Sequence, residues 1–168
     1  MRSLLFSASL LLMTPLAAHA GESIASDRSF LVPYIGVFDV LDNKNSTQFG
    51  LEYRYVDIGY GVRPTIGGNV DSDGGAYVYG GLDWDLPLGY SFTLTPNFAV
   101  GLYHEGDSKD LGGTLEFRSG LEVSYAFENQ SRVGVSFNHV SNASIYDSNP
   151  GAETLLVNYQ LPLDWFGE

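Results

Sequence analysis

Residues 114–127 read TLEFRSGLEVSYAF, and the character of the side chains alternates along the whole stretch. The odd-numbered positions are mostly large and apolar: Leu115, Phe117, Ser119, Leu121, Val123, Tyr125 and Phe127. The even-numbered positions are charged or small: Glu116, Arg118, Gly120, Glu122, Ser124 and Ala126. Because side chains of a β-strand point alternately to its two faces, a period of two predicts a strand with one apolar and one charged face.

The same alternation recurs along the chain. It is clean in residues 48–55 and weaker in residues 30–40, 61–66, 76–86, 90–104, 132–141 and 153–163. Together with residues 114–127 these segments predict about eight strands. The connections at 42–46, 67–75, 105–113 and 142–152 are polar and mostly long, whereas those at 87–89 and 128–131 are tight. Long loops on one side and short turns on the other are typical of outer-membrane barrels, so we predict an eight-stranded antiparallel β-barrel.

The N-terminal residues have the features of an export signal. Arg2 precedes an apolar run, and Ala18-His19-Ala20 forms a small-x-small cleavage site. We therefore expect residues 1–20 to be a signal peptide and residues 21–168 to form one transmembrane barrel domain. No later stretch reaches the roughly eighteen consecutive apolar residues of a membrane-spanning helix, so strands must make any crossing.

The charge and cysteine content narrow the function classes. The formal net charge is −12, which argues against nucleic acid as a partner because phosphates would be repelled. The chain has no cysteine, so disulfides cannot stabilise it. His104 stands beside Glu105 and Asp107, but one histidine with scattered acids is typical of a solvated loop, and we assign no metal site there.

Alternation alone does not say which face of the barrel points inward. A soluble periplasmic lipid-binding barrel would turn its apolar face inward, and this alternative stays open. The charged residues favour a membrane barrel, because they could pair with one another inside a narrow, filled lumen. These residues are Glu52, Arg54, Glu116, Arg118 and Glu122. The opposite face would then supply the continuous apolar band that lipid requires.

Three polar residues share the apolar face of the last two predicted strands. His139 and Ser141 have the parity of Val135 and Phe137, and Glu153 has the parity of Leu155. If these strands form a hairpin with Ser141 roughly opposite Glu153, facing side chains lie about 5 Å apart, and His139 is diagonal to Glu153. A serine, a histidine and a carboxylate would then meet on the lipid-facing surface.

These residue types suit ester hydrolysis. Ser141 is a nucleophile once a base removes its proton, His139 can act as that base, and Glu153 can hold the imidazole tautomer. The backbone amides of Asn142 and Ala143, directly after the nucleophile, are candidate donors for an oxyanion hole. The alternative is a non-enzymatic barrel, structural or adhesive, in which the three are interfacial polar residues at the end of a strand.

The stretch His139-Val140-Ser141-Asn142-Ala143, followed by Asn149-Pro150-Gly151 and Glu153, resembles the signature of the lipid A 3-O-deacylases called PagL. The resemblance implies an eight-stranded barrel in the outer membrane of a Gram-negative bacterium, which removes the acyl chain ester-linked at the 3 position of lipid A. It implies Ser141 as nucleophile, His139 as base and Glu153 as orienting acid, with Asn142 and Ala143 at the oxyanion hole. The resemblance implies no cofactor. It implies that lipid A, as substrate, and outer-membrane lipid are the partners. The sequence leaves homodimer formation open.

Overall fold

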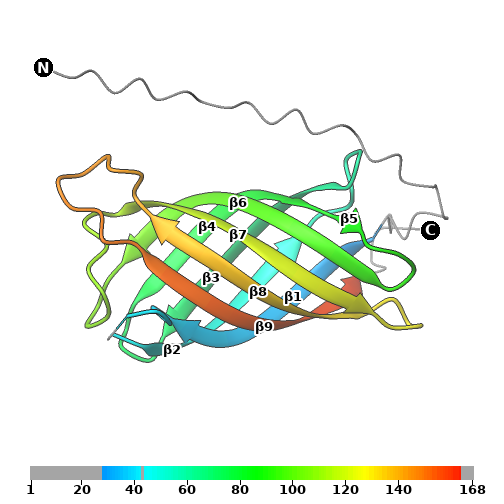
Figure 1. Ribbon diagram of the computed structural model, residues 1–168, viewed down its shortest axis with the longest axis horizontal. Helices are drawn as coiled ribbons and strands as arrows, with labels where there is room; N and C mark the ends of the chain where they lie inside the picture. The colour runs from blue at the N-terminus through cyan, green and yellow to red at the C-terminus, as the bar shows by residue number, and fades with distance from the viewer. Residues whose placement is uncertain (1–27, 43, 164–168) are drawn as a thin grey trace, which may run out of the picture.

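The computed structural model describes residues 28–42 and 44–163. The expected signal peptide, residues 1–20, lies outside these ranges. The described residues form one closed barrel of antiparallel strands, whose long axis is horizontal in Figure 1. They include no helix that is long and apolar enough to cross a bilayer.

The barrel consists of eight long strands and one short one. These are β1 (Ser29–Phe38), β2 (Ser46–Arg54), β3 (Val62–Asp71), β4 (Ala76–Trp84), β5 (Leu86–Pro87), β6 (Phe92–His104), β7 (Leu115–Ala126), β8 (Arg132–Ser141) and β9 (Ala152–Leu163). The strands pair in the order β4-β3-β2-β1-β9-β8-β7-β6, and pairing of β4 with β6 closes the sheet, while β5 only extends it beside β6. The predicted eight-stranded antiparallel barrel is confirmed.

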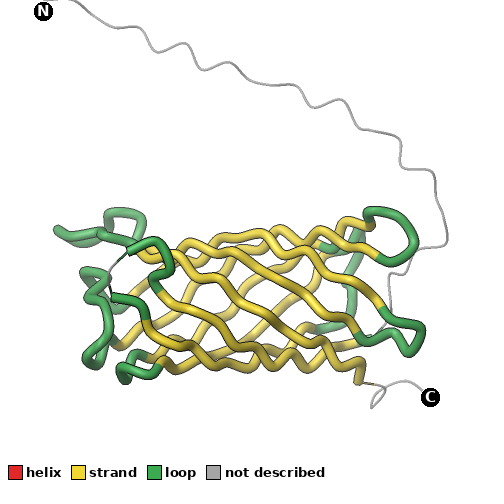
Figure 2. Tube along the Cα trace, turned by 60° about the horizontal axis from the view of Figure 1, so that its bottom comes forward, coloured by secondary structure: helices red, strands yellow, loops and turns green. Residues whose placement is uncertain are grey.

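The two ends of the barrel differ in their connections. β1 starts and β9 ends at one end, together with the turns after β2, β5 and β7. The connections after β1, β3, β6 and β8 lie at the other end, on the left in Figure 2, which we call the loop end. The predicted connections 42–46, 67–75, 105–113 and 142–152 thus fall at the loop end, and the tight turns 87–89 and 128–131 fall at the other end.

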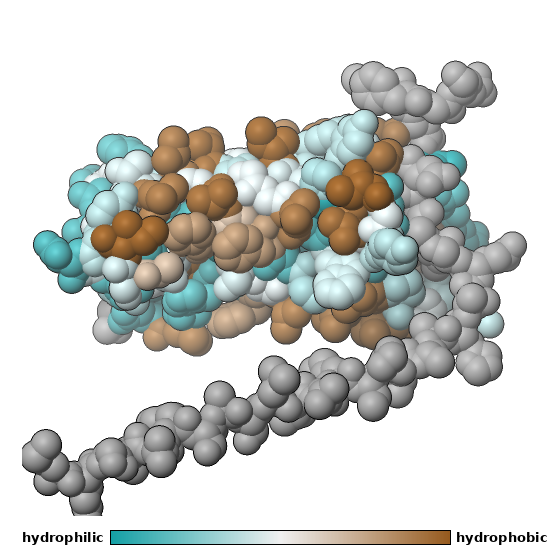
Figure 3. Space-filling model, turned by 90° about the horizontal axis from the view of Figure 1, so that it is seen from above, coloured by the Kyte–Doolittle hydropathy of each residue, from teal (hydrophilic) through white to brown (hydrophobic). Residues whose placement is uncertain are grey.

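The apolar face of the sheet points outward. Exposed side chains on this face include Phe49, Leu51, Leu121, Val123, Val135 and Val157. Figure 3 shows hydrophobic side chains spread along the barrel wall, with hydrophilic ones more frequent toward the ends. An outward apolar wall is the arrangement of a membrane barrel and contradicts a soluble barrel with its apolar face inward.

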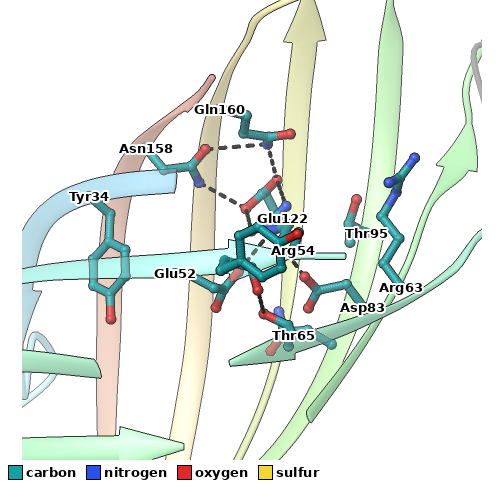
Figure 4. Close-up of polar contacts among 12 residues, drawn as sticks. Tyr34, Glu52, Arg54, Arg63, Thr65, Asp83, Thr95, Glu122, Asn158 and Gln160 are labelled. Carbon is teal, nitrogen blue, oxygen red and sulfur yellow. Dashed lines mark hydrogen bonds and ion pairs between the residues drawn. The ribbon is translucent and has the colours of Figure 1, made fainter. Parts of the chain in front are cut away.

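The inward face carries a network of ion pairs. Arg54 donates to both carboxylate oxygens of Glu122, at 3.0 and 2.8 Å, and its Nε donates to Glu52 at 2.7 Å. Arg118 also donates to Glu52, at 3.0 Å. Figure 4 shows Glu52 and Arg54 of β2 converging with Glu122 of β7. The predicted pairing of interior charges is therefore confirmed for these four residues, whose burial leaves the network almost no solvent screening.

Glu116 is the exception among the predicted interior charges. It is fully buried, yet neither carboxylate oxygen has a hydrogen-bond partner in the described part of the chain. Arg118, two residues away on the same face, instead donates to Glu52 and lies 4.0 Å from the centre of the Tyr79 ring. The expectation that Glu116 joins the pairing was wrong because Arg118 is committed to these partners.

The lumen is filled with side chains. Two of its cavities have volumes of about 10 and 20 Å³, enough for about one water molecule each. Near the loop end Phe38, Tyr77, Tyr103 and Leu111 are buried in one apolar cluster. The centre of the barrel is therefore packed with side chains.

One predicted loop is partly strand. Residues 67–75 were expected to be a polar connection, but β3 continues to Asp71. Gly67 lies opposite Tyr79 in the β3–β4 ladder, and a Cβ at Gly67 would lie only 2.6 Å from the Tyr79 hydroxyl oxygen. This glycine makes room for a tyrosine inside a strand and does not mark a turn.

Candidate active site

The pairing of β8 with β9 brings His139 and Glu153 together. They lie directly opposite each other in the ladder, and His139 Nδ1 is 3.0 Å from Glu153 Oε1. The predicted register, with Ser141 opposite Glu153, was wrong by two residues. A shift of two residues leaves every side chain on the same face, so the alternation that predicted the faces could not detect it.

The histidine–carboxylate pair lies on the outer wall near the loop end. The side chains of His139 and Glu153 are 46% and 27% exposed. Phe137 and Leu155 face each other on the adjacent outward positions of β8 and β9, further from the loop end, and both are exposed. The polar pair thus lies next to an apolar part of the outer wall, on its loop-end side.

The hydrogen bond determines what each imidazole nitrogen can do. An ionised carboxylate can only accept hydrogen bonds, so the Nδ1–H group of His139 donates the hydrogen bond to Glu153. In the neutral imidazole, Nε2 then carries the lone pair and is the nitrogen that can take up a proton. The pair has the geometry of a base and its orienting acid.

Ser141 lies on the same outward face of β8, two residues closer to the loop end than His139. It is half-buried and faces Phe117 in the β7–β8 ladder. Within the described residues its hydroxyl makes no hydrogen bond, so the structure does not join it to the imidazole. Hydrogen bonds between a catalytic nucleophile and its base are often long in the absence of substrate and shorten only in the enzyme–substrate complex.

The structure reveals a second serine beside the imidazole. Ser119 of β7 lies directly opposite His139 and is exposed on the outer wall. Sequence reasoning gave it no role, although its odd-numbered position among the apolar residues of 114–127 places it on the outward face. Ser119 is therefore the natural control for any test of Ser141.

The loop after β8 places the predicted oxyanion donors differently from each other. The Asn142 backbone amide donates to Asn149 Oδ1 at 3.0 Å. The Asn142 side-chain amide donates to the carbonyls of Leu111 and Ser148, both at 2.8 Å, and the residue is fully buried. Asn142 thus organises the loop, a role that its place beside the predicted nucleophile did not suggest.

Ala143 follows in a left-handed conformation. Its φ is 52° and that of Ser144 is 61°, a strained arrangement for two consecutive residues that are not glycine. The Ser144 amide donates to Asn142 Oδ1 at 3.0 Å, which stabilises this turn. The amide of Ala143 makes no hydrogen bond within the described residues, so it is the candidate donor that is available to a substrate.

Contacts with the neighbouring loops hold this turn in place. The Leu115 amide donates to the Tyr146 hydroxyl at 3.2 Å. Lys109 donates to Asp39 at 2.7 Å and to Asp42 at 3.0 Å. Partial burial lowers the pKa of Lys109, but its hydrogen bonds to these two carboxylates outweigh that effect and raise the pKa above its ordinary value. The loop after β8 is thereby held at the start of β7, and the loop after β6 is held to the loop after β1.

No group of three or more histidine or acidic side chains suited to a metal ion occurs within residues 28–42 and 44–163.

A family model described as lipid A 3-O-deacylase (PagL) matches residues 47–162. This range includes the His139–Glu153 pair, Ser141 and the loop after β8. A search of curated proteins found no match.

Solved structures of small outer-membrane barrels are similar to the whole described fold. The outer-membrane enzyme PagL matches with a TM-score of 0.63 and 18% identity, over 80% of this chain and 99% of that chain. Neisserial surface protein A matches with a TM-score of 0.57 and 12% identity, over 82% of this chain and 98% of that chain. The Yersinia pestis outer membrane protein Ail matches with a TM-score of 0.50 and 16% identity, over 81% of this chain and 100% of that chain. At these identities the structural likeness establishes the fold alone.

Proposed function

Because the chain belongs to the lipid A 3-O-deacylase (PagL) family, we propose that it is a serine esterase that hydrolyses the acyl chain ester-linked at the 3 position of lipid A. Its fold is that of an outer-membrane barrel. Export through a signal peptide at residues 1–20, cleaved before Gly21, belongs to the same proposal.

One observation carries the proposal beyond family membership: the hydrogen bond between His139 and Glu153 on the outer wall. Polar and ionisable groups beside a lipid-facing surface are expensive, so stability alone gives no reason to place them there. A substrate that is itself a membrane lipid gives such a reason. The non-enzymatic alternative leaves this pair without a role.

In the proposed reaction Ser141 Oγ attacks the ester carbonyl carbon while His139 Nε2 takes the hydroxyl proton. Glu153 stabilises the imidazolium that forms. The tetrahedral oxyanion accepts from the Ala143 amide, and from the Asn142 amide if Asn149 releases it. Collapse breaks the bond to the sugar oxygen, which receives the proton from Nε2. Water, deprotonated by the same nitrogen, then releases the fatty acid and restores Ser141.

The substrate would enter sideways from the outer leaflet. Its sugar head would lie at the loop end, and its acyl chain would run along the outward apolar side chains, beginning with Phe137 and Leu155. Surrounding acyl chains would keep bulk water from the ester, which strengthens the electrostatic interactions at the site. No aqueous cleft is needed for this arrangement.

The direct test is mass spectrometry of lipid A incubated with the purified protein in detergent, where any restraint by the native membrane is absent. We expect the loss of one hydroxyacyl mass, and fragmentation of the product should place the loss at the 3 position. Loss from another position would contradict the regiochemistry. Unchanged lipid A would contradict the esterase and favour the non-enzymatic barrel.

Replacing the orienting acid tests the proposed division of roles. Glu153→Gln removes the charge that stabilises the imidazolium, so we expect kcat to fall by about 10²-fold or more while the barrel stays folded. Release of fatty acid from purified lipid A measures this. Glu105→Gln removes an exposed carboxylate at the same end and should leave kcat unchanged. Equal rates for both variants would refute the role of Glu153.

A further inference from the structure

Gly151 lies next to the imidazole that the proposed mechanism uses. It is buried, immediately precedes β9, and has a φ of +64°. This left-handed conformation favours glycine, but it is not the only constraint on the position. A Cβ built on Gly151 would lie 2.7 Å from His139 Cε1 and 3.3 Å from His139 Nε2.

The first of these distances is too short for two carbon atoms that are not bonded. The Cβ of any other residue would therefore push the imidazole away, since the ring is the movable partner. Among the other left-handed glycines, a Cβ at Gly59, Gly74 or Gly89 meets nothing within 4 Å, whereas a Cβ at Gly61, Gly106 or Gly112 meets backbone carbonyl oxygens first. Gly151 must therefore lack a side chain for two reasons: its backbone is left-handed, and the His139 imidazole occupies the space that a Cβ would need.

The contact also shows which way the ring faces. Ala152 lies opposite Val140, so Gly151 is level with Ser141. The Cε1–Nε2 edge of the ring approaches Gly151, while Nδ1 is held by Glu153. The edge that carries Nε2 is therefore turned toward the level of Ser141, whereas Ser119 is level with His139 itself.

We propose that Gly151 is a positioning residue for the reaction: its bare Cα is the surface against which the His139 imidazole is set, with Nδ1 on Glu153 and Nε2 turned toward Ser141. This inference rests on the proposed function for its catalytic meaning. The position of the ring is a separate structural claim, and it can be tested without any substrate.

The test compares Gly151→Ala with Gly74→Ala, both in the full-length protein folded in detergent micelles. Both variants place alanine at a left-handed position, but only the first adds a methyl group beside the imidazole. We expect Gly151→Ala to lower kcat by about 10²-fold with KM nearly unchanged, since a misplacement of about 1 Å has this effect on catalysis. Gly74→Ala should keep the wild-type kcat.

A spectroscopic measurement separates positioning from general damage. Nitrogen-15 NMR of labelled histidine distinguishes the two neutral tautomers. The variants His19→Asn and His104→Asn identify the signals of the other two histidines, and the remaining signal belongs to His139. The wild type and Gly74→Ala should show the Nδ1–H tautomer, whereas Gly151→Ala should show a mixture. If alanine prevents folding, Gly151→Asn tolerates a left-handed φ yet still carries a Cβ, and it should give the same mixture.

The outcomes are distinguishable. An unchanged tautomer and an unchanged kcat in Gly151→Ala or Gly151→Asn would overturn the inference. A wild-type protein that shows the Nδ1–H tautomer but hydrolyses no lipid A would contradict the proposed function, while the tautomer comparison would still decide where Gly151 places the ring.

Discussion

Ser141→Ala is expected to lower kcat/KM for lipid A hydrolysis by at least about 10³-fold. The substitution removes the oxygen that bonds to the acyl carbon, and neither the His139–Glu153 pair nor the Ala143 amide can replace it. Ser141 is half-buried on the outer wall and makes no hydrogen bond within the described residues, so its loss should not unfold the barrel. Heat-modifiable migration in electrophoresis verifies the fold, and mass spectrometry of lipid A at equal protein amounts measures the activity.

Ser119→Ala is the matched control for this prediction. It removes the same hydroxyl from the other serine beside His139, on the same outward face. We expect it to keep most of the activity, because the Nε2 edge of the imidazole is turned toward the level of Ser141. Full activity in Ser141→Ala together with its loss in Ser119→Ala would transfer the nucleophile to β7. Full activity in both variants would eliminate the serine mechanism.

Glu122→Ala should lower the free energy of unfolding by about 3–5 kcal/mol. Glu122 accepts two hydrogen bonds from Arg54, one from Asn158 at 2.8 Å and one from Gln160 at 2.6 Å. Without Glu122 the guanidinium of Arg54 stays in the lumen with fewer counter-charges and cannot reach bulk water. Breaking a buried pair in this way is far more costly than removing an exposed charge.

Urea unfolding of the refolded protein in detergent micelles measures the effect. Glu128→Ala removes an equal charge from an exposed position in the turn after β7 and should change stability by less than about 0.5 kcal/mol. A loss as small for Glu122→Ala would show that the interior network contributes little. Because Glu122 lies inside the lumen and the proposed site outside it, residual folded protein should retain its activity per molecule.

Several features were predictable because they depend on the alternation of side chains. Residues 114–127 identify the two faces of β7 by parity alone, and the charges of Glu52, Arg54, Arg118 and Glu122 correctly indicated which face is inside. His139 and Glu153 were placed on the outward face for the same reason. The nucleophile and oxyanion roles of Ser141, Asn142 and Ala143 stay predictions.

Other features depend on contacts between segments that parity does not order. The predicted β8–β9 register paired Glu153 with Ser141, whereas the structure pairs Glu153 with His139, two residues away along β8. Residues 67–75 were predicted to be a connection, whereas the structure pairs Gly67 with Tyr79 inside the β3–β4 ladder. Asn149 belonged to the family signature without a role, and only the folded loop shows it accepting from the Asn142 amide.

The sequence by itself determined the class of fold and which side chains share a face of the wall, including the common face of His139, Ser141 and Glu153 near the loop end. These follow from a local period of two, which each strand carries within its own residues. The tertiary structure decided which residues meet: the His139–Glu153 bond, the place of Ser119 and the contact of Gly151 with the imidazole. Register and loop conformation are set by packing between neighbouring strands, and a shift of two residues costs nothing in alternation while it exchanges every partner across the ladder.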